Sequence, residues 1–321
     1  PARRQFLKRE LYAAQLLGET DDGKKIFLYD YRADSAVMHE IGRLRELTFR
    51  TVEEGTGAAL DIDRYDVYYR HLVLWDDHEL EIVGAYRLGE CHQIMQKQGL
   101  EGLYTSTLFE LHSPIQQHLP EAIELGRSFV QPRYWGKRSL DYLWFGIGAY
   151  LRAHPHIKYL FGPVSLSQAY PQASKDIIIA FYNKQFGSDK LMASAKIPFS
   201  ISPEAQQLAD NEFAEDYKNS YRQLNSQLKT LGVKVPTLYK QYTEICEAGG
   251  CQFLAFHIDP AFNYCIDSLI LVDLDKLKPR KKARYIGSTT TSLTTNLPCS
   301  TDHHQSDNKN SQYCKLEVMS A

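Results

Sequence analysis

The chain has 321 residues, and 43% of them are apolar, so it can bury a sizeable core. We expect one domain to hold this core. Its 37 basic residues almost balance its 39 acidic ones, and a net charge of -2 gives no general attraction to nucleic acid or anionic lipid. The longest apolar runs fall far short of the roughly 20 residues that a spanning helix needs. Six cysteines without a CxxC pair favour reduced, structural thiols.

The N-terminal half predicts, in chain order, a helix, a strand, a second helix and a pair of strands. Charges interleaved with apolar positions over residues 1 to 18 predict a helix, and residues 26–31 predict a strand. After this strand, the helical spacing of apolar residues predicts a second helix that extends through residue 50. Residues 68–75 and 82–88 predict two strands joined by an acidic turn, which is typical of an antiparallel meander.

The most informative segment runs from Glu124 to Arg138. An apolar run ending at Pro132 predicts a strand, and the apolar repeat at 140–151 predicts an amphipathic helix. Gly136 lies at the joint between them. Such a turn aims free backbone N–H groups and a helix N-terminus at one point, where a pyrophosphate or phosphopantetheine phosphate is stabilised.

The C-terminal half alternates again. It predicts a strand at 158–164, a helix over 167–187, a helix at 235–248, and strands at 251–257 and 268–273. From residue 288 the composition turns to serine, threonine, asparagine and lysine, so residues 288–321 are expected to be a disordered polar tail. The histidines and cysteines there fit no zinc spacing, so we expect no metal site.

Several motifs resemble known acyltransferases. Val130-x-Pro132-x-Tyr134-x-Gly136 resembles the donor-binding strand and turn of the GNAT acyltransferase superfamily, although Arg138 stands where that family usually has a small residue. With residues 42–50, 61–66, 83–88 and 124–128, and later 235–242 and 259–262, the chain resembles the ornithine-acyl carrier protein N-acyltransferase family, also labelled haemolysin-like.

This resemblance covers residues 26–287 and implies an α+β, GNAT-like fold with a mixed, mostly antiparallel central sheet flanked by helices. Residues 1–25 are then expected to be an N-terminal helical segment that links to a preceding domain, since the sequence given begins without methionine. The chain is most similar to the C-terminal half of bifunctional bacterial aminolipid synthases. That similarity implies an upstream O-acyltransferase domain.

The resemblance also implies catalytic residues. Glu124 is expected either to take the proton of the acceptor amine or to bind its ammonium group; the alternative is a structural carboxylate that pairs with Arg127. Tyr182 is expected to protonate the leaving thiolate, against the alternative that it packs in the core.

Arg87 and Arg127 lie in strands expected to be buried, where a guanidinium needs a partner. That partner is either the carboxylate of an amino-acid acceptor or an internal network with three aspartates. In similar proteins, including acyl-homoserine lactone synthases, these residues surround the acceptor pocket. We therefore expect the pocket to be lined by Arg43, Arg45, Arg50, Asp61, Asp63, Asp66, Arg87 and Arg127.

The donor is expected to be an acyl-phosphopantetheine, with no bound cofactor. Backbone N–H groups at a strand bulge near Phe129 and Val130 would stabilise the thioester oxyanion. The donor site is expected to include Phe129, Val130, Pro132, Arg133, Gly136, Lys137 and Arg138. Together with Arg152 and Lys158, its basic residues either dock an acidic carrier protein or form a solvated surface.

The expected function is transfer of a long 3-hydroxyacyl chain from acyl carrier protein to the amine of ornithine or a related amino acid. One alternative is a coenzyme A-dependent acetyl- or acyltransferase acting on another small amine. The other is a non-catalytic, haemolysin-like lipid-binding protein. We expect the protein in the cytoplasm, with peripheral contact at the inner face of the membrane.

Overall fold

The structure, a computed structural model, describes residues 4–213 and 216–287. Within them, eight strands form one sheet in the order β1-β2-β3-β4-β6-β7-β10-β9, and β5 and β8 form a separate pair. Neighbouring strands are antiparallel except β6 and β7. This confirms the predicted mixed, mostly antiparallel sheet. The strands are β1 Gln15–Glu19, β2 Lys24–Asp30, β3 Arg70–Asp76, β4 Glu81–Glu90, β5 Phe109–Leu111, β6 Ala122–Val130, β7 Tyr159–Leu166, β8 Ala193–Ala195, β9 Cys251–Asp259 and β10 Cys265–Asp273.

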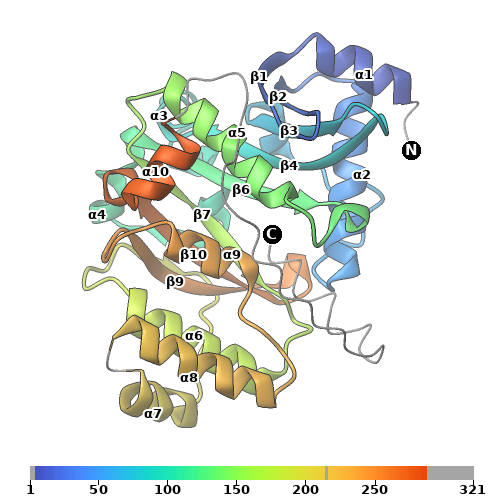
Figure 1. Ribbon diagram of the computed structural model, residues 1–321. Coiled ribbons are helices and arrows are strands. Elements are labelled where there is room, and N and C mark those ends of the chain that lie inside the picture. The colour runs from blue at the N-terminus through green and yellow to red at the C-terminus, as the bar shows by residue number, and fades with distance from the viewer. Residues whose placement is uncertain (1–3, 214–215, 288–321) are drawn as a thin grey trace.

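Ten α-helices flank the sheet in the described part of the chain. Figure 1 shows α6, α7 and α8 gathered beside the C-terminal strands β9 and β10. The helices are α1 Arg4–Tyr12, α2 Ala36–Thr51, α3 Cys91–Gln98, α4 Ser113–Gln116, α5 Ser139–Ala153, α6 Gln172–Phe186, α7 Pro203–Glu212, α8 Tyr217–Thr230, α9 Thr237–Glu244 and α10 Pro279–Tyr285.

The strands and helices with clear apolar periodicity lie where the sequence predicts them. The strand predicted at 26–31 is β2, and the helix predicted from 140 onward is α5. One difference lies at the N-terminus, where only Arg4–Tyr12 is helical and Gln15–Glu19 is an edge strand paired with β2. The predicted tail at 288–321 lies outside the described residues.

The sheet is covered on both faces. Ile123 and Leu125 of β6 belong to a large core that also contains Leu143 and Ile147 of α5. Phe129, farther along the same strand, packs instead in the core that contains α2. Strand β6 therefore contributes to both cores.

Two sequence expectations concern single features of this fold. Cys91, Cys246, Cys251 and Cys265 are buried free thiols, as predicted. Across the residues that the structure describes, every helix is too short or too polar to span a bilayer.

Candidate functional site

Strands β6 and β7 separate partway along their length. They pair in parallel only where Ala122–Glu124 face Tyr159–Phe161. Gly162, the next residue of β7, has φ 148, and a Cβ there would lie 2.1 Å from the carbonyl oxygen of Leu125. Any other residue at this position would push the strands apart. The two strands are thus joined closely at one end and open at the other.

A bulge in β6 lies beside this opening. Ala85 of β4 pairs with Phe129 and Arg87 pairs with Gly126, so two residues, Arg127 and Ser128, lie opposite one. Arg127 has φ 49, in the left-handed region. The bulge predicted near Phe129 and Val130 is therefore one to two residues earlier, because these two residues still pair regularly with β4. A bulge turns backbone groups out of the ladder, and here they lie at the gap between strands.

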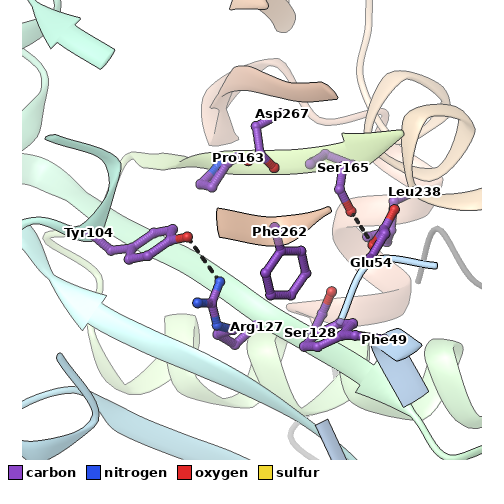
Figure 2. Close-up of a pocket in the computed structure, with 11 residues that line it drawn as sticks. Phe49, Glu54, Tyr104, Arg127, Ser128, Pro163, Ser165, Leu238, Phe262 and Asp267 are labelled. Carbon is purple, nitrogen blue, oxygen red and sulfur yellow. Dashed lines mark hydrogen bonds between the residues drawn. The ribbon is translucent and has the colours of Figure 1, made fainter. Parts of the chain in front are cut away.

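The gap holds a cavity that is partly open to solvent, and the space within it, including this open part, is about 520 Å³. In Figure 2, Arg127 and Ser128 lie on its β6 side, and Pro163 and Ser165 lie on its β7 side. The remaining wall mixes aromatic, aliphatic and acidic side chains contributed by segments far apart in sequence: Phe49, Glu54, Tyr104, Val164, Leu238, Phe262 and Asp267.

The turn after β6 leaves backbone donors free. Within residues 4–213 and 216–287, Gly136, Lys137 and Arg138 donate no backbone hydrogen bond. Gly136 has φ 71, and α5 begins at Ser139 without a side-chain cap. Because β6 runs toward this turn, the free donors follow the open end of the strand pair. A phosphate is the ligand that such an arrangement stabilises.

The basic residues near this turn differ in their surroundings. Arg133 is neutralised by Glu79 and Glu81, at 2.5 and 2.8 Å. Arg138 lies 3.4 Å from Asp141. Lys137 lies over the ring of Tyr134, and among the described residues it has no carboxylate partner. Lys137 is therefore the cation of this turn that is most available to an anionic ligand.

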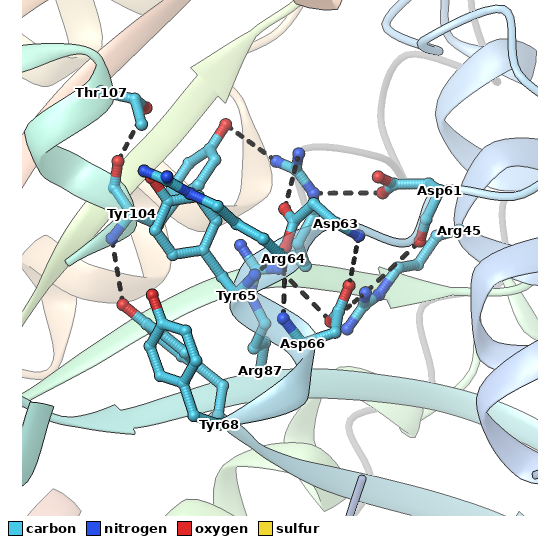
Figure 3. A network of polar contacts seen from close by, with 12 residues as sticks. Arg45, Asp61, Asp63, Arg64, Tyr65, Asp66, Tyr68, Arg87, Tyr104 and Thr107 are labelled. Atoms are coloured by element: carbon cyan, nitrogen blue, oxygen red, sulfur yellow. Dashed lines mark hydrogen bonds and ion pairs between the residues drawn. The ribbon is translucent and has the colours of Figure 1, made fainter. Parts of the chain in front are cut away.

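The acidic loop before β3 binds the buried arginines. The Arg87 guanidinium lies 2.7 Å from Asp63 and 3.3 Å from Asp66, and Arg45 lies 2.7 Å from Asp66 (Figure 3). Arg127 lies 3.1 Å from Asp61, and it donates a 3.0 Å hydrogen bond to the hydroxyl of Tyr104. This is the internal network that the sequence left as one alternative; a role of these residues in acceptor binding stays a prediction.

The charges in this network stabilise one another. Burial opposes ionisation of Asp66, but Arg45 and Arg87 lower the pKa of its carboxyl below the ordinary value. Burial and Arg45 together lower the pKa of the neighbouring His71 to about 3, so this imidazole is neutral at physiological pH. Three aspartates therefore neutralise three arginines here.

Two of the predicted acceptor arginines lie outside this network. Arg43 pairs with Glu40 at 2.6 Å, and Arg50 pairs with Glu46 at 2.6 Å, all on α2. Neither arginine lines the cavity.

Glu124 is buried beside the network, with 2% of its surface exposed. It accepts hydrogen bonds from the backbone N–H of Thr105 at 2.7 Å, from the Thr105 hydroxyl at 2.5 Å, and from the Tyr69 hydroxyl. Burial raises the pKa of Glu124, and the hydrogen bonds from Thr105 and Tyr69 oppose the rise. Glu124 is not among the residues that line the cavity.

Tyr182 of α6 lies in an aromatic cluster. Its ring contacts Tyr239, Phe253 and Phe186, with centroids 4.8 to 5.7 Å away. Its hydroxyl is buried and has no hydrogen-bond partner within the described part of the chain. Burial raises the pKa of this phenol well above its ordinary value. The side chain packs in the core, which was the structural alternative, and a catalytic role stays a prediction.

Sequence reasoning missed two acidic residues of the cavity, Glu54 and Asp267. Asp267 lies beside Ser268 in the mostly apolar strand β10, and a buried charge in such a strand is a signal that points to a special site. Glu54 follows α2 in a polar segment and gives no such signal.

Comparisons with known proteins agree with this architecture. The acetyltransferase (GNAT) domain family matches residues 44–145, which include β3, β4, β6 and the following turn.

Two relatives that match this chain over most of their length define the family more closely. The chain is 33% identical to a glycine Nα-acyltransferase of Phocaeicola vulgatus, over 90% of this chain and 92% of that protein. It is 31% identical to a glycine Nα-acyltransferase of Bacteroides thetaiotaomicron, over 89% and 88%. A match to an L-ornithine Nα-acyltransferase of Brucella abortus is 33% identical and covers 46% and 61%. The chain therefore belongs to the family of amino-acid Nα-acyltransferases with a GNAT domain, and it is an N-acyltransferase enzyme.

Proposed function

We propose that the enzyme transfers a long acyl chain, such as a 3-hydroxyacyl chain, from the phosphopantetheine of acyl carrier protein to the α-amine of a small amino acid. Glycine and ornithine are the first acceptors to test, because the named relatives act on them. The product is a lyso-aminolipid. The observation that supports this proposal most is the cavity between β6 and β7, which lies beside a bulge in the strand that ends at a turn with free backbone donors.

The donor runs from the turn into the cavity. Its phosphate binds the free N–H groups at Gly136 to Arg138 and the ammonium group of Lys137. Its pantetheine arm then follows the open edge of β6, where the thioester reaches the bulge at Arg127 and Ser128. Backbone donors at the bulge stabilise the charge that develops on the thioester oxygen.

The acceptor enters as an ammonium ion and must lose a proton before its nitrogen attacks, because a protonated amine has no lone pair. A carboxylate near the thioester promotes this step. Glu124 is the carboxylate expected from the sequence, and its test is Glu124→Gln, which removes the charge and keeps the shape. A base role predicts a loss of turnover of roughly 10²-fold or more.

The proposal is tested by incubating the purified chain with acyl carrier protein loaded with a 3-hydroxyacyl group and with a panel of amino acids that includes glycine and ornithine. Mass spectrometry of the lipid extract identifies the N-acyl product. Acyl-coenzyme A of the same chain length is the parallel donor. Formation of an N-acyl amino acid with the carrier-protein donor supports the proposal; product from coenzyme A alone contradicts the donor assignment; no product from either donor contradicts the whole proposal.

A further inference from the structure

The cavity between β6 and β7 contains two buried carboxylates, Glu54 and Asp267. Glu54 follows α2 and Asp267 lies on β10, so the fold brings them together from residues more than 200 positions apart (Figure 2). Their exposed fractions are 3% and 7%. Buried carboxylates are costly unless they are protonated, hydrogen-bonded or paired with a cation.

Their partners within the protein are few. Glu54 accepts one hydrogen bond, from the hydroxyl of Ser165 at 2.9 Å. Within residues 4–213 and 216–287, the Asp267 side chain accepts no hydrogen bond and forms no ion pair. Asp267 nevertheless lines the cavity. An almost fully buried, unpartnered carboxylate that borders an open space points to a ligand that supplies the missing hydrogen-bond donors.

The acidic groups around the cavity favour a cationic ligand: burial, Asp259 and Glu54 raise the pKa of Asp267 well above its ordinary value, and a bound cation would favour the ionised form. Arg127 is its one lining cation in the described chain, and Asp61 and Asp63 already lie 3.1 and 3.6 Å from that guanidinium. Glu54 and Asp267 therefore have no free arginine or lysine to neutralise them. The ammonium group of an amino acid carries three N–H donors and one positive charge, which suits two carboxylates on one cavity.

We propose that this cavity receives the ammonium group of the acceptor, that Asp267 holds it, and that Glu54 takes its proton as the general base. This inference rests on the proposed acyl transfer and adds the site of the amine to it. The thioester at the bulge and the nitrogen beside Glu54 then meet within one cavity, since Ser128 and Glu54 both line it.

The proposed step balances as follows. Glu54 takes one proton from the ammonium group, and the neutral nitrogen attacks the thioester carbonyl carbon to form the C–N bond. The tetrahedral adduct then expels the pantetheine sulfur, which keeps the electron pair of the broken C–S bond. The second proton that nitrogen loses goes to this thiolate, and Glu54 returns its own proton to solvent.

The protonation behaviour of Glu54 fits this role. Burial raises the pKa of Glu54 from 4.5 to about 7, and the hydrogen bond from Ser165 opposes the rise. A base with a pKa near the working pH combines a large ionised fraction with useful basicity. The titratable and charged groups that interact with Glu54 or with Asp267 itself come from four elements around the cavity: Tyr239 of α9, Cys265 and Asp267 of β10, Asp259 of β9 and Arg127 of β6.

Glu124 is less suited to take this proton. Both of its oxygens already accept hydrogen bonds, from Thr105 and Tyr69, and it does not line the cavity. These three hydrogen bonds fill most of the roughly four acceptor positions of the carboxylate. We therefore expect different results when Glu54 and when Glu124 is replaced by glutamine.

The test compares the pH dependence of kcat/KM for the acceptor in the wild-type enzyme, Glu54→Gln and Glu124→Gln, with the donor saturating. The wild-type rate is expected to rise with pH through about 7. Glu54→Gln is expected to lower the rate by ~10²-fold and to abolish this rise. Glu53→Gln is the matched control, because this neighbouring glutamate is exposed, and it should retain the wild-type profile.

Two further variants keep the inference falsifiable should Glu54→Gln fold poorly. Ser165→Ala removes the hydrogen bond that favours ionised Glu54, so the rise in rate should move to higher pH. Asp267→Asn should raise the KM for the acceptor more than it lowers kcat. Provided that the wild-type enzyme is active, the inference is overturned if the rise of kcat/KM with pH persists in Glu54→Gln and disappears in Glu124→Gln. It is also overturned if Ser165→Ala shows the rise at the same pH as the wild type. A wild-type enzyme with no product from any thioester overturns the proposed function instead.

Discussion

Buried Glu54 should make the stability of the fold depend on pH, and Glu54→Gln should remove that dependence. The wild-type carboxyl has a pKa of about 7 in the folded chain, against an ordinary value of 4.5. Between these two values the folded state binds more protons than the unfolded state. The contribution of Glu54 to the free energy of unfolding is therefore fully present below about pH 4.5 and is lost as pH rises through about 7.

The size of the effect follows from that interval. At about 1.4 kcal/mol per pH unit, the interval corresponds to about 3 kcal/mol of unfolding free energy. Glutamine keeps the shape and the acceptor oxygen for the hydroxyl of Ser165, but it does not titrate. The difference in stability between Glu54→Gln and wild type should therefore grow by about 3 kcal/mol between pH 4.5 and 7 in favour of the variant, and then level off.

Urea denaturation followed by tryptophan fluorescence at a series of pH values measures this difference. Taking the difference between variants cancels groups that titrate identically in both. Glu53→Gln, at the adjacent exposed position, should show no such growth. A difference that stays constant from pH 4.5 to 8 would show that Glu54 titrates normally, and the reasoning from its burial would be wrong.

Three further predictions concern the turn, the ion-pair network and the donor. Gly136→Ala places a side chain on a residue with φ 71, where no atom lies within 4 Å of the added Cβ. The expected effect is backbone strain of about 1 kcal/mol rather than a clash, and it should raise the KM for the donor several-fold in steady-state assays. Asp66→Asn leaves Arg45 and Arg87 without the carboxylate between them and should lower the unfolding free energy by about 3–5 kcal/mol in urea titrations. With a carrier-protein donor the rate should fall steeply as salt is raised, whereas a free pantetheine thioester should respond weakly; equal responses would exclude docking through charges such as Lys137.

The sequence predicts those elements whose own residues carry the pattern. Strand β6 and helix α5 have apolar positions at strand and helix spacing, so both were located from residues 122 to 153 alone. Edge strand β1 lies in a segment for which the sequence predicts a helix, and this prediction is wrong because none of its residues is buried and its conformation depends on backbone pairing with β2. Apolar spacing does not record such a partner.

The residues of the candidate site also fall into those that the sequence predicts and those that it does not. Glu124, Arg87 and Arg127 are charged residues inside predicted strands, and a charge in an apolar strand can be recognised from the sequence alone. Glu54 and Asp267 approach each other only because β10 pairs with β7 and because β7 separates from β6. Register and strand separation are properties of the assembled sheet, so no spacing in the sequence encodes this pair.

The assembled network also changes which end of the acceptor the cavity is suited to bind. From the sequence, Arg87 and Arg127 were expected either to bind the acceptor carboxylate or to pair internally, and the acidic loop occupies them. With the arginines neutralised, the acidic groups left facing the cavity are the carboxyl groups of Glu54 and Asp267. In the proposed acceptor site, electrostatic selection would therefore act on the ammonium group, which every free amino acid carries and from which the proposed reaction removes a proton. Under this proposal, discrimination between acceptor side chains would depend on the apolar and aromatic wall rather than on the arginines.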